Sequence, residues 1–184
     1  MTPMLGIMAS AISGNLFAPS GAYDSIATTT LTGSQATITF SSIPSTYTHL
    51  QLRIFGKATA SAYLKITFNG ASTNFDSHYL DGNGTSATAG FDAATTFISN
   101  YGAIANTTTS VFGTVIIDLL DYANTNKYKT YRSLSGTDYN GSGSVDLTSG
   151  LWQSTSAISQ IDLNVNTGSF AQYSSFALYG IKGA

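Results

Sequence analysis

The chain has 184 residues, of which 42% are hydrophobic and only 9% are charged, and it contains seven Lys and Arg, nine Asp, and no Cys or Glu. This length suits one domain whose core is large enough to be stable without covalent cross-links. The lack of Cys excludes disulfides and thiolate metal sites. The net charge is −2, and no apolar run reaches the length of a membrane span, so we expect neither nucleic acid nor a membrane as a partner.

Residue types that favour β-strands dominate the composition. Thr, Ser, Tyr, Phe, Val and Ile are abundant, whereas the helix formers Glu, Lys and Arg together contribute seven residues. The charged fraction is far below the average of about 25% for soluble domains. The composition therefore predicts an all-β protein whose surface is polar through hydroxyl and amide groups.

Residues 1–22 combine apolar side chains with Gly and Pro but have no regular period. No Lys or Arg precedes Arg53, so we do not expect a secretory signal, which begins with a basic region. We predict an irregular N-terminal arm, followed by a single domain over residues 23–184. The arm is too apolar to remain in water, so it is either a strand on its own core or an anchor between subunits. Its expected interface side chains are Leu5, Ile7, Met8, Ile12, Leu16 and Phe17.

From Tyr23 the pattern changes to alternating strands. Two strand-like runs, residues 23–31 and 36–40, flank a turn at Gly33-Ser34, which predicts a hairpin. Pro44 then fixes its own φ and holds the preceding residue extended, so the chain should leave the sheet there. We expect it to enter another strand over residues 50–54, with Tyr47 covering the open end of the core.

The next segment combines a strand with a long polar stretch. The strand over residues 63–68 should end at Asn69-Gly70, a dipeptide typical of tight turns. Residues 71–95 are rich in Asn, Asp and Gly, which predicts a loop around one short strand at 78–80. Loops of this length are usually functional or ordered by a partner, so we expect contacts with a partner here.

The second half of the chain is richer in strands. Residues 110–120 are its most apolar run, which predicts a central strand covered on each side by its own core or by a second subunit. Further strands are expected over residues 96–101, 128–136, 145–147, 158–165 and 176–181, with a turn at 140–143. About ten strands at this spacing predict a two-sheet antiparallel β-sandwich with a jelly-roll-like arrangement.

Three segments carry a resemblance to a known family. They are residues 40–53 around the proline corner, Phe68-Asn69-Gly70, and the closing stretch Phe176-Ala177-Leu178-Tyr179-Gly180-Ile181. In this order they resemble a family of phage-encoded β-sandwich virion proteins. The resemblance implies a structural place in a virion assembled in the host cytoplasm, and it carries over no catalytic residue.

Four Asp residues are candidate metal ligands. Asp118 and Asp121, with two Asn nearby, offer oxygen ligands for Ca²⁺ at a strand end, although their spacing matches no established loop. Asp76 and Asp81 flank His78, and strand alternation would put Asp76 and His78 on one face, as a metal site or an acid–base pair requires. The alternative is that these Asp residues only cap turns.

Aromatic side chains near the expected loops are candidates for contact with a partner. Tyrosine and tryptophan rings stack on the apolar faces of sugars, but in a sandwich they are also common core and interface residues. The side chains singled out on this basis are His78, Tyr79, Tyr101, Tyr122, Tyr139 and Trp152. Their partner would be either a neighbouring protein or a host glycan.

An enzyme is not expected. The sequence contains no nucleophile elbow, phosphate-binding loop or Cys nucleophile, and with two His and no Glu only Asp pairs remain for acid–base chemistry. We expect a virion structural protein, a capsid decoration (cement) or head-fibre protein that associates with itself, as a trimer, and with other virion proteins. The alternative is a recognition module, either a receptor-binding tail domain or a carbohydrate-binding domain.

Overall fold

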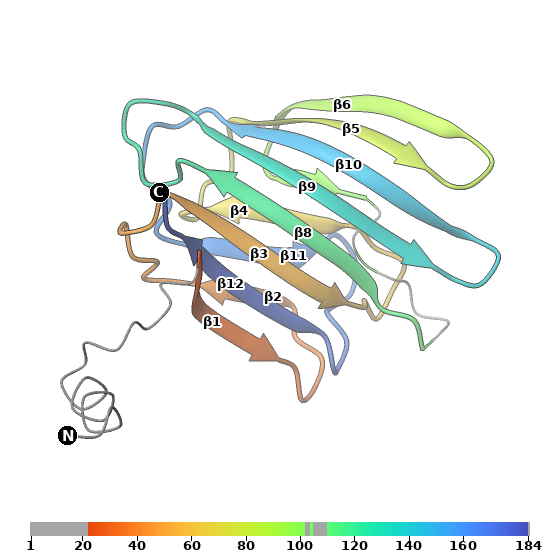
Figure 1. Ribbon diagram of the computed structural model, residues 1–184. Helices are drawn as coiled ribbons and strands as arrows, with labels where there is room; N and C mark the ends of the chain where they lie inside the picture. Colours follow the sequence, from red (N-terminus) through yellow and green to blue (C-terminus); the bar gives the residue numbers. More distant parts are fainter. Residues whose placement is uncertain (1–21, 102–103, 105–109, 184) are drawn as a thin grey trace, which may run out of the picture.

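The computed structural model describes residues 22–101, 104 and 110–183, and this part of the chain forms twelve strands in two antiparallel sheets (Figure 1). The larger sheet has eight strands in the order β1 (Tyr23–Thr30), β12 (Ser175–Ile181), β3 (His49–Gly56), β8 (Gly113–Leu120), β9 (Lys129–Asp138), β10 (Gly143–Trp152), β5 (Phe75–Gly82) and β6 (Ala87–Thr95). The smaller sheet has four strands in the order β2 (Thr37–Phe40), β11 (Ile161–Val165), β4 (Leu64–Phe68) and β7 (Ile98–Asn100).

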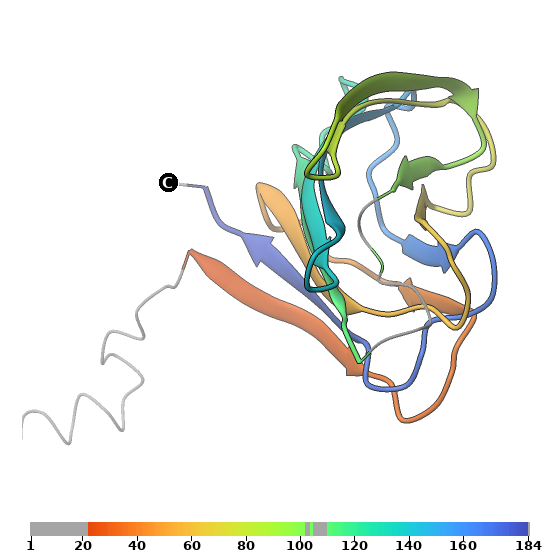
Figure 2. The same cartoon turned by 90° about the vertical axis from the view of Figure 1, so that its right-hand side faces the viewer.

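The two sheets form the layers of a β-sandwich, as predicted; the jelly-roll arrangement stays a prediction. Figure 2 shows the layers from the side, with the β5–β6 end of the large sheet bending over toward β7. None of the described segments is a helix long and apolar enough to cross a membrane.

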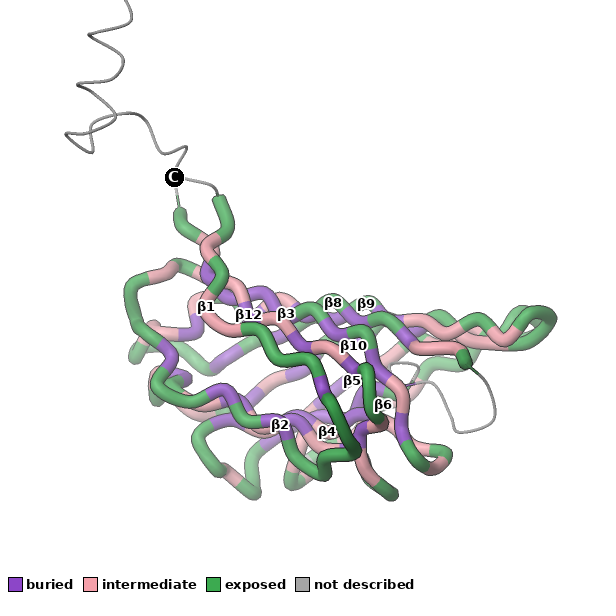
Figure 3. The backbone as a smooth tube through the Cα atoms, turned by 90° about the horizontal axis from the view of Figure 1, so that it is seen from below, coloured by how far each residue is buried: buried purple, intermediate pink, exposed green. Residues whose placement is uncertain are grey.

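Alternation along each strand separates the core from the surface. In β8, Val115, Ile117 and Leu119 are at most 2% exposed, while the residues between them face outward. The buried colour in Figure 3 alternates along the strands in the same way. Burying each of these large side chains contributes about 1.5–3 kcal/mol, so the inner faces of the two sheets provide most of the stabilising contacts.

The proline corner lies where the chain crosses from one sheet to the other. β2 belongs to the small sheet and β3 to the large one, so the predicted change of strand at Pro44 is confirmed. Tyr122 donates a hydrogen bond to the Pro44 carbonyl. The ring of Tyr47 lies over Gly180 of β12, where a Cβ would overlap it. Tyr47 therefore packs at the edge of the core, as expected.

The predicted hairpin of residues 23–31 and 36–40 is wrong. β1 pairs with β12 at the edge of the large sheet, whereas β2 pairs with β11 in the small sheet. Between them, Leu31 is buried and exchanges backbone hydrogen bonds with Tyr173 and Ser174. This contact directs the chain from one layer to the other, because burial of Leu31 prevents a simple reversal within one sheet.

The predicted loop of residues 71–95 is also wrong, because it forms a hairpin of two long strands, β5 and β6. Its turn follows Asn83, whose side-chain oxygen accepts hydrogen bonds from the backbone of Thr85 and Ser86, while Gly84 takes a φ of 88°. Asn, Asp and Gly side chains lower strand propensity, but this hairpin is at the edge of the sheet, where few of its side chains need to be buried.

Lys129 is buried at the start of β9, next to the β8–β9 loop. Its ammonium group donates to the backbone carbonyls of Asn124, Lys127 and Thr155, and its residue is only 2% exposed. Desolvation lowers the pKa of this lysine. Three carbonyl acceptors offset part of that desolvation cost, so Lys129 fixes the loop and does not add to a basic surface.

The core becomes polar toward β9 and β10. Asn100 of β7 donates to the Ser133 hydroxyl and accepts a hydrogen bond of 2.9 Å from Ser135, and both serines lie on the inner face of β9. Tyr131 is buried beside them, 3.5 Å from Ser133. Burial raises the pKa of Tyr131 to about 12. The folded protein therefore holds this phenol in its neutral form.

Alkaline pH should unfold the protein partly through Tyr131. Its pKa is raised in the folded state, so its contribution to stability is complete below the unfolded pKa of 10 and is lost as pH rises toward about 12. The loss amounts to about 3 kcal/mol, at ~1.4 kcal/mol for each pKa unit. The measurement is the free energy of unfolding against pH. Tyr131→Phe should flatten the decline, and Tyr128→Phe, at a side chain that is 55% exposed, should not.

Candidate functional site

A row of large apolar side chains crosses the outer face of the eight-stranded sheet. The register pairs Ile116 of β8 with Leu134 of β9, Leu134 with Leu147 of β10, and Leu147 with Leu80 of β5. Directly paired residues project from the same face of a sheet. These four side chains, the apolar row, are 46%, 55%, 47% and 51% exposed in that order.

Further apolar side chains extend the row along the same face. Val145 is 61% exposed and lies two positions before Leu147 on β10, and Leu120 and Phe55 are also exposed on this side. Phe55 stacks on Phe112 with ring centroids 4.9 Å apart. Exposed apolar patches of this kind are common at association sites of proteins in general.

A narrow polar row borders the apolar row. Asp118 of β8 accepts a 2.9 Å hydrogen bond from Gln51 and forms an ion pair with Arg132 of β9 at 3.4 Å. Arg53 stacks over the rings of Tyr179 and Tyr23, at 4.9 and 5.4 Å from their centroids. Asp118 and Arg132 therefore neutralise each other, whereas Arg53 contacts the Gln51 amide and two rings and keeps its positive charge.

The candidate Ca²⁺ ligands at the end of β8, Asp118 and Asp121, each form an ion pair with a basic side chain. Asp118 pairs with Arg132, and Asp121 pairs with Lys127, whose hydrogen bond lowers the pKa of the Asp121 carboxyl. Asp121 has a φ of 50° and its carbonyl accepts a hydrogen bond of 2.9 Å from Asn124 N–H, so it lies in a turn. The Asp121 carboxylate therefore contacts Lys127 and His49, and Asp121 takes part in the turn through its backbone carbonyl.

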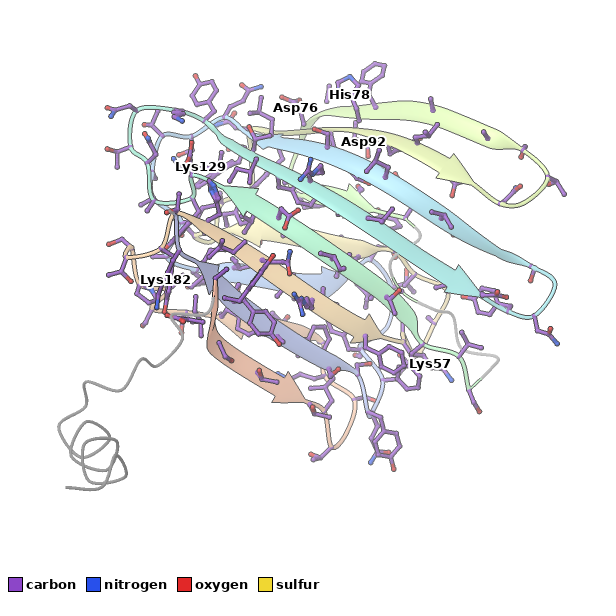
Figure 4. All side chains as sticks on the ribbon, viewed as in Figure 1. Lys57, Asp76, His78, Asp92, Lys129 and Lys182 are labelled. Atoms are coloured by element: carbon purple, nitrogen blue, oxygen red, sulfur yellow. The ribbon has the colours of Figure 1, made fainter. Side chains whose placement is uncertain are left out.

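The other Asp pair is divided between the two faces of β5. Asp76 and His78 lie together on the outer face, as alternation predicted (Figure 4). Asp81 lines a hollow on the inner face with Tyr79. His78 stacks on Phe91 of β6 with ring centroids 5.8 Å apart, and Asp76 accepts a hydrogen bond from Gln153. No group of three or more His, Cys, Asp or Glu gathers among the residues that the structure describes.

Two of the predicted contact rings are in the core. Trp152 is 5% exposed and stacks on Phe75 at 6.0 Å, and Tyr122 is fully buried beneath the proline corner. Neither ring can stack on an external partner, and this part of the prediction is corrected. Both residues lie near predicted loops, but Trp152 ends the inner face of β10 and Tyr122 lies two residues after the end of β8.

Three other predicted contact residues, Tyr79, Tyr101 and Tyr139, lie near one another at one end of the sandwich. Tyr79 of β5 and Tyr101, directly after β7, lie with ring centroids 5.1 Å apart, and Tyr101 also packs on Tyr63 at 4.9 Å. Burial, and then the nearby carboxylate of Asp92, raise the pKa of Tyr101, whose hydroxyl donates to Asp92 at 3.4 Å. A hollow that borders Tyr101 reaches Tyr139 in the β9–β10 turn.

The arm residues Leu5, Ile7, Met8, Ile12, Leu16 and Phe17 lie outside the described part of the chain, so their interface role stays a prediction. Comparison of the chain with protein-family models, with curated proteins and with solved structures found no match. The case for a function therefore depends on the residues and their geometry.

Substitution within the apolar row should leave the folded subunit nearly as stable as before. Leu134 is more than half exposed, so Leu134→Thr should change the free energy of unfolding of the isolated subunit by no more than about 0.5 kcal/mol. Leu163→Ala, at a fully buried position of β11, should cost about 2–5 kcal/mol. Urea denaturation of both variants is the measurement, and a similar loss in each would show that the row is part of the subunit core.

Proposed function

We propose that the chain is a non-enzymatic structural protein of a bacteriophage virion, a capsid decoration (cement) or head-fibre protein that assembles with copies of itself and with the capsid. The observation that carries the proposal is the apolar row on the outer face of the large sheet. The family resemblance of the proline corner and the closing strand supports the virion setting. The low charge supports extensive, weakly charged contacts between subunits.

The occupant we assign to the row is the outer sheet face of neighbouring copies in a closed ring. The face carries Asp118 beside Arg132, so a neighbouring copy offers each charge an opposite partner. Strands with apolar side chains on both faces are typically covered on both sides, and the own core of the described chain covers only the inner side of β8. A trimer with these faces turned toward a common axis would bury all three rows.

The free energy gained by burying the apolar row is comparable with the free energy cost of association. Covering the exposed halves of its four side chains contributes roughly 3–6 kcal/mol for each copy, or roughly 6–12 kcal/mol for a pair. Association costs about 4–15 kcal/mol in lost translational and rotational freedom. The two rows therefore about balance this cost, and burial of Val145, Leu120 and Phe55 on the same face, or of the apolar arm, would provide the surplus for stable assembly.

Charge placed in the row should prevent assembly without unfolding the subunit. We expect the double variant Leu134→Lys and Leu147→Lys to remain monomeric at micromolar concentration, where the unmodified chain forms a trimer, because unpaired lysines would be desolvated in the interface. Light scattering gives the mass, and circular dichroism reports the fold. Ser72→Lys, in the exposed β4–β5 loop, is the control and should assemble normally. A clean monomer for the unmodified chain would contradict self-association through this face.

Removal of the arm should separate an anchor from a core strand. If residues 1–22 are an anchor, the chain from Tyr23 onward should keep its melting temperature yet fail to enter particles during infection. The reason is that the truncated chain lacks the large apolar side chains that contact neighbouring subunits, each of which contributes about 1.5–3 kcal/mol when buried. If they complete the core, the truncated chain should melt many degrees lower, since the margin of stability is only about 5–15 kcal/mol. Normal incorporation of a stable truncated chain would argue against the anchor.

A further inference from the structure

The three tyrosines at the β5–β6 end border two adjoining hollows, which we call the tyrosine groove. The first hollow has a volume of about 260 Å³ and is lined by Tyr79, Asp81, Thr88, Tyr101 and Ser144. The second has a volume of about 380 Å³, and its lining includes Tyr139, Ser61 and Ser142. Tyr101 and Ser144 line both hollows, so the two are neighbours along one wall.

Strand pairing fixes the lining of the first hollow. Tyr79 pairs with Gly90 of β6, and Asp81 pairs with Thr88, so these side chains share the inner face of the edge hairpin. The Tyr79 ring lies over Gly90, where a Cβ would overlap the phenol. Glycine at this position therefore lets the ring lie flat against β6, and the ring becomes a wall of the groove.

The chemistry of the lining suits a neutral, polyhydroxylated ligand. Tyrosine rings provide flat apolar surfaces of the kind that pack against the C–H faces of a sugar ring. Hydroxyls of Thr88, Ser142 and Ser61 donate and accept, and Asp81 accepts from ligand hydroxyls. The Ser144 hydroxyl donates to Asp146 and offers the ligand an acceptor. Two adjoining hollows of this size match two consecutive sugar units better than one compact ligand.

Charged ligands fit this groove less well. Among the described residues that line the two hollows, Asp81 is the only charged one at neutral pH, so an anionic ligand would meet repulsion and no cationic partner. A quaternary ammonium is typically held by rings on several sides. Of the described residues that line the first hollow, only Tyr79 and Tyr101 carry rings, and the others are Asp81, Thr88 and Ser144.

We propose that the tyrosine groove is a binding site for a neutral oligosaccharide, with Tyr79 and Tyr101 stacking on one sugar unit, Asp81 accepting hydrogen bonds from its hydroxyls, and Tyr139 contacting the next unit. This site goes beyond the virion role and does not depend on the apolar row, which is on the opposite face of the large sheet. Tyr101 is 40% exposed, so a ligand can reach its ring from solution.

The test uses the full chain with neutral trisaccharides of glucose, galactose, mannose and N-acetylglucosamine as probes. Saturation-transfer NMR detects binding, and calorimetry measures the Kd of the probe that binds best. We expect at least one probe to bind, with Tyr101→Ala and Asp81→Asn each weakening it about tenfold or more through loss of a stacking surface or a charged acceptor. Tyr128→Ala removes a more exposed tyrosine outside the groove and should leave the Kd unchanged.

Asp81→Asn keeps the size of the side chain, so it is unlike a truncation and should leave the fold intact. Melting curves show whether each variant is folded. Failure of all four probes to bind at millimolar concentration would overturn the proposal. Binding that survives both substitutions in folded variants would overturn it as well, as would binding of choline in place of the sugars. Light scattering on the same samples tests self-association separately, so a failed groove and a failed assembly face can be told apart.

Discussion

The register between β8, β9, β10 and β5 is the constraint on which both surfaces of this protein depend. Side chains along a strand alternate with a period of two, so a slip of one residue would exchange inner and outer faces. In the observed register, Ile117 faces the core while Ile116 joins Leu134 on the outer face. The same register brings Tyr79 opposite Thr148 on the inner face. The apolar row and the tyrosine groove are therefore two consequences of one set of strand pairings.

The inner face changes character across the large sheet. One inner row begins with Leu178, Leu52 and Ile117 and continues through Ser133, Thr148, Tyr79 and Gly90. The apolar half packs on the small sheet, which provides the core. The polar half lies under β7 of the small sheet, where Asn100 donates to Ser133 and accepts from Ser135, and Ser133 and Thr148 are each only 1% exposed. The large sheet therefore changes from an apolar to a polar buried layer before it reaches Tyr79 and the groove.

Sequence periodicity predicts the strands well wherever one face of the strand is buried. The runs around the proline corner, Leu64–Phe68 and the closing strand each alternate cleanly, and each was placed correctly. For the edge hairpin β5–β6 the sequence predicts only a short strand at 78–80, because Asp, Ser and Gly interrupt its apolar residues. Its full length depends on pairing with β10, which no local pattern contains. Partner choice failed for β1 and β2 for the same reason.

The candidate surfaces were only partly predictable for a related physical reason. A long apolar strand at 110–120 already indicated cover on both sides, but the apolar row needs residues from four strands distant in sequence, which only the register aligns. The sequence predicts Tyr79, Tyr101 and Tyr139 as contact residues one by one, because each lies near an expected loop. It does not predict that they lie together. Trp152 met the same criterion and is buried, because nearness to a loop in sequence does not determine on which face of a strand a ring lies.

The positions of the two surfaces also bear on whether one protein can use both. A copy that covers the apolar row contacts the outer face of β8, β9, β10 and β5, whereas the groove is on the inner side of β5, β6 and β10. The thickness of the sheet separates them, so assembly through the row does not require the groove to close. In an assembled particle, each subunit would then present its own groove, and several grooves on one surface would engage a repetitive polysaccharide with an avidity far above that of a single site. A groove that binds sugars only feebly in isolation is consistent with this arrangement, because multivalency supplies the strength that a shallow, hydroxyl-lined site does not.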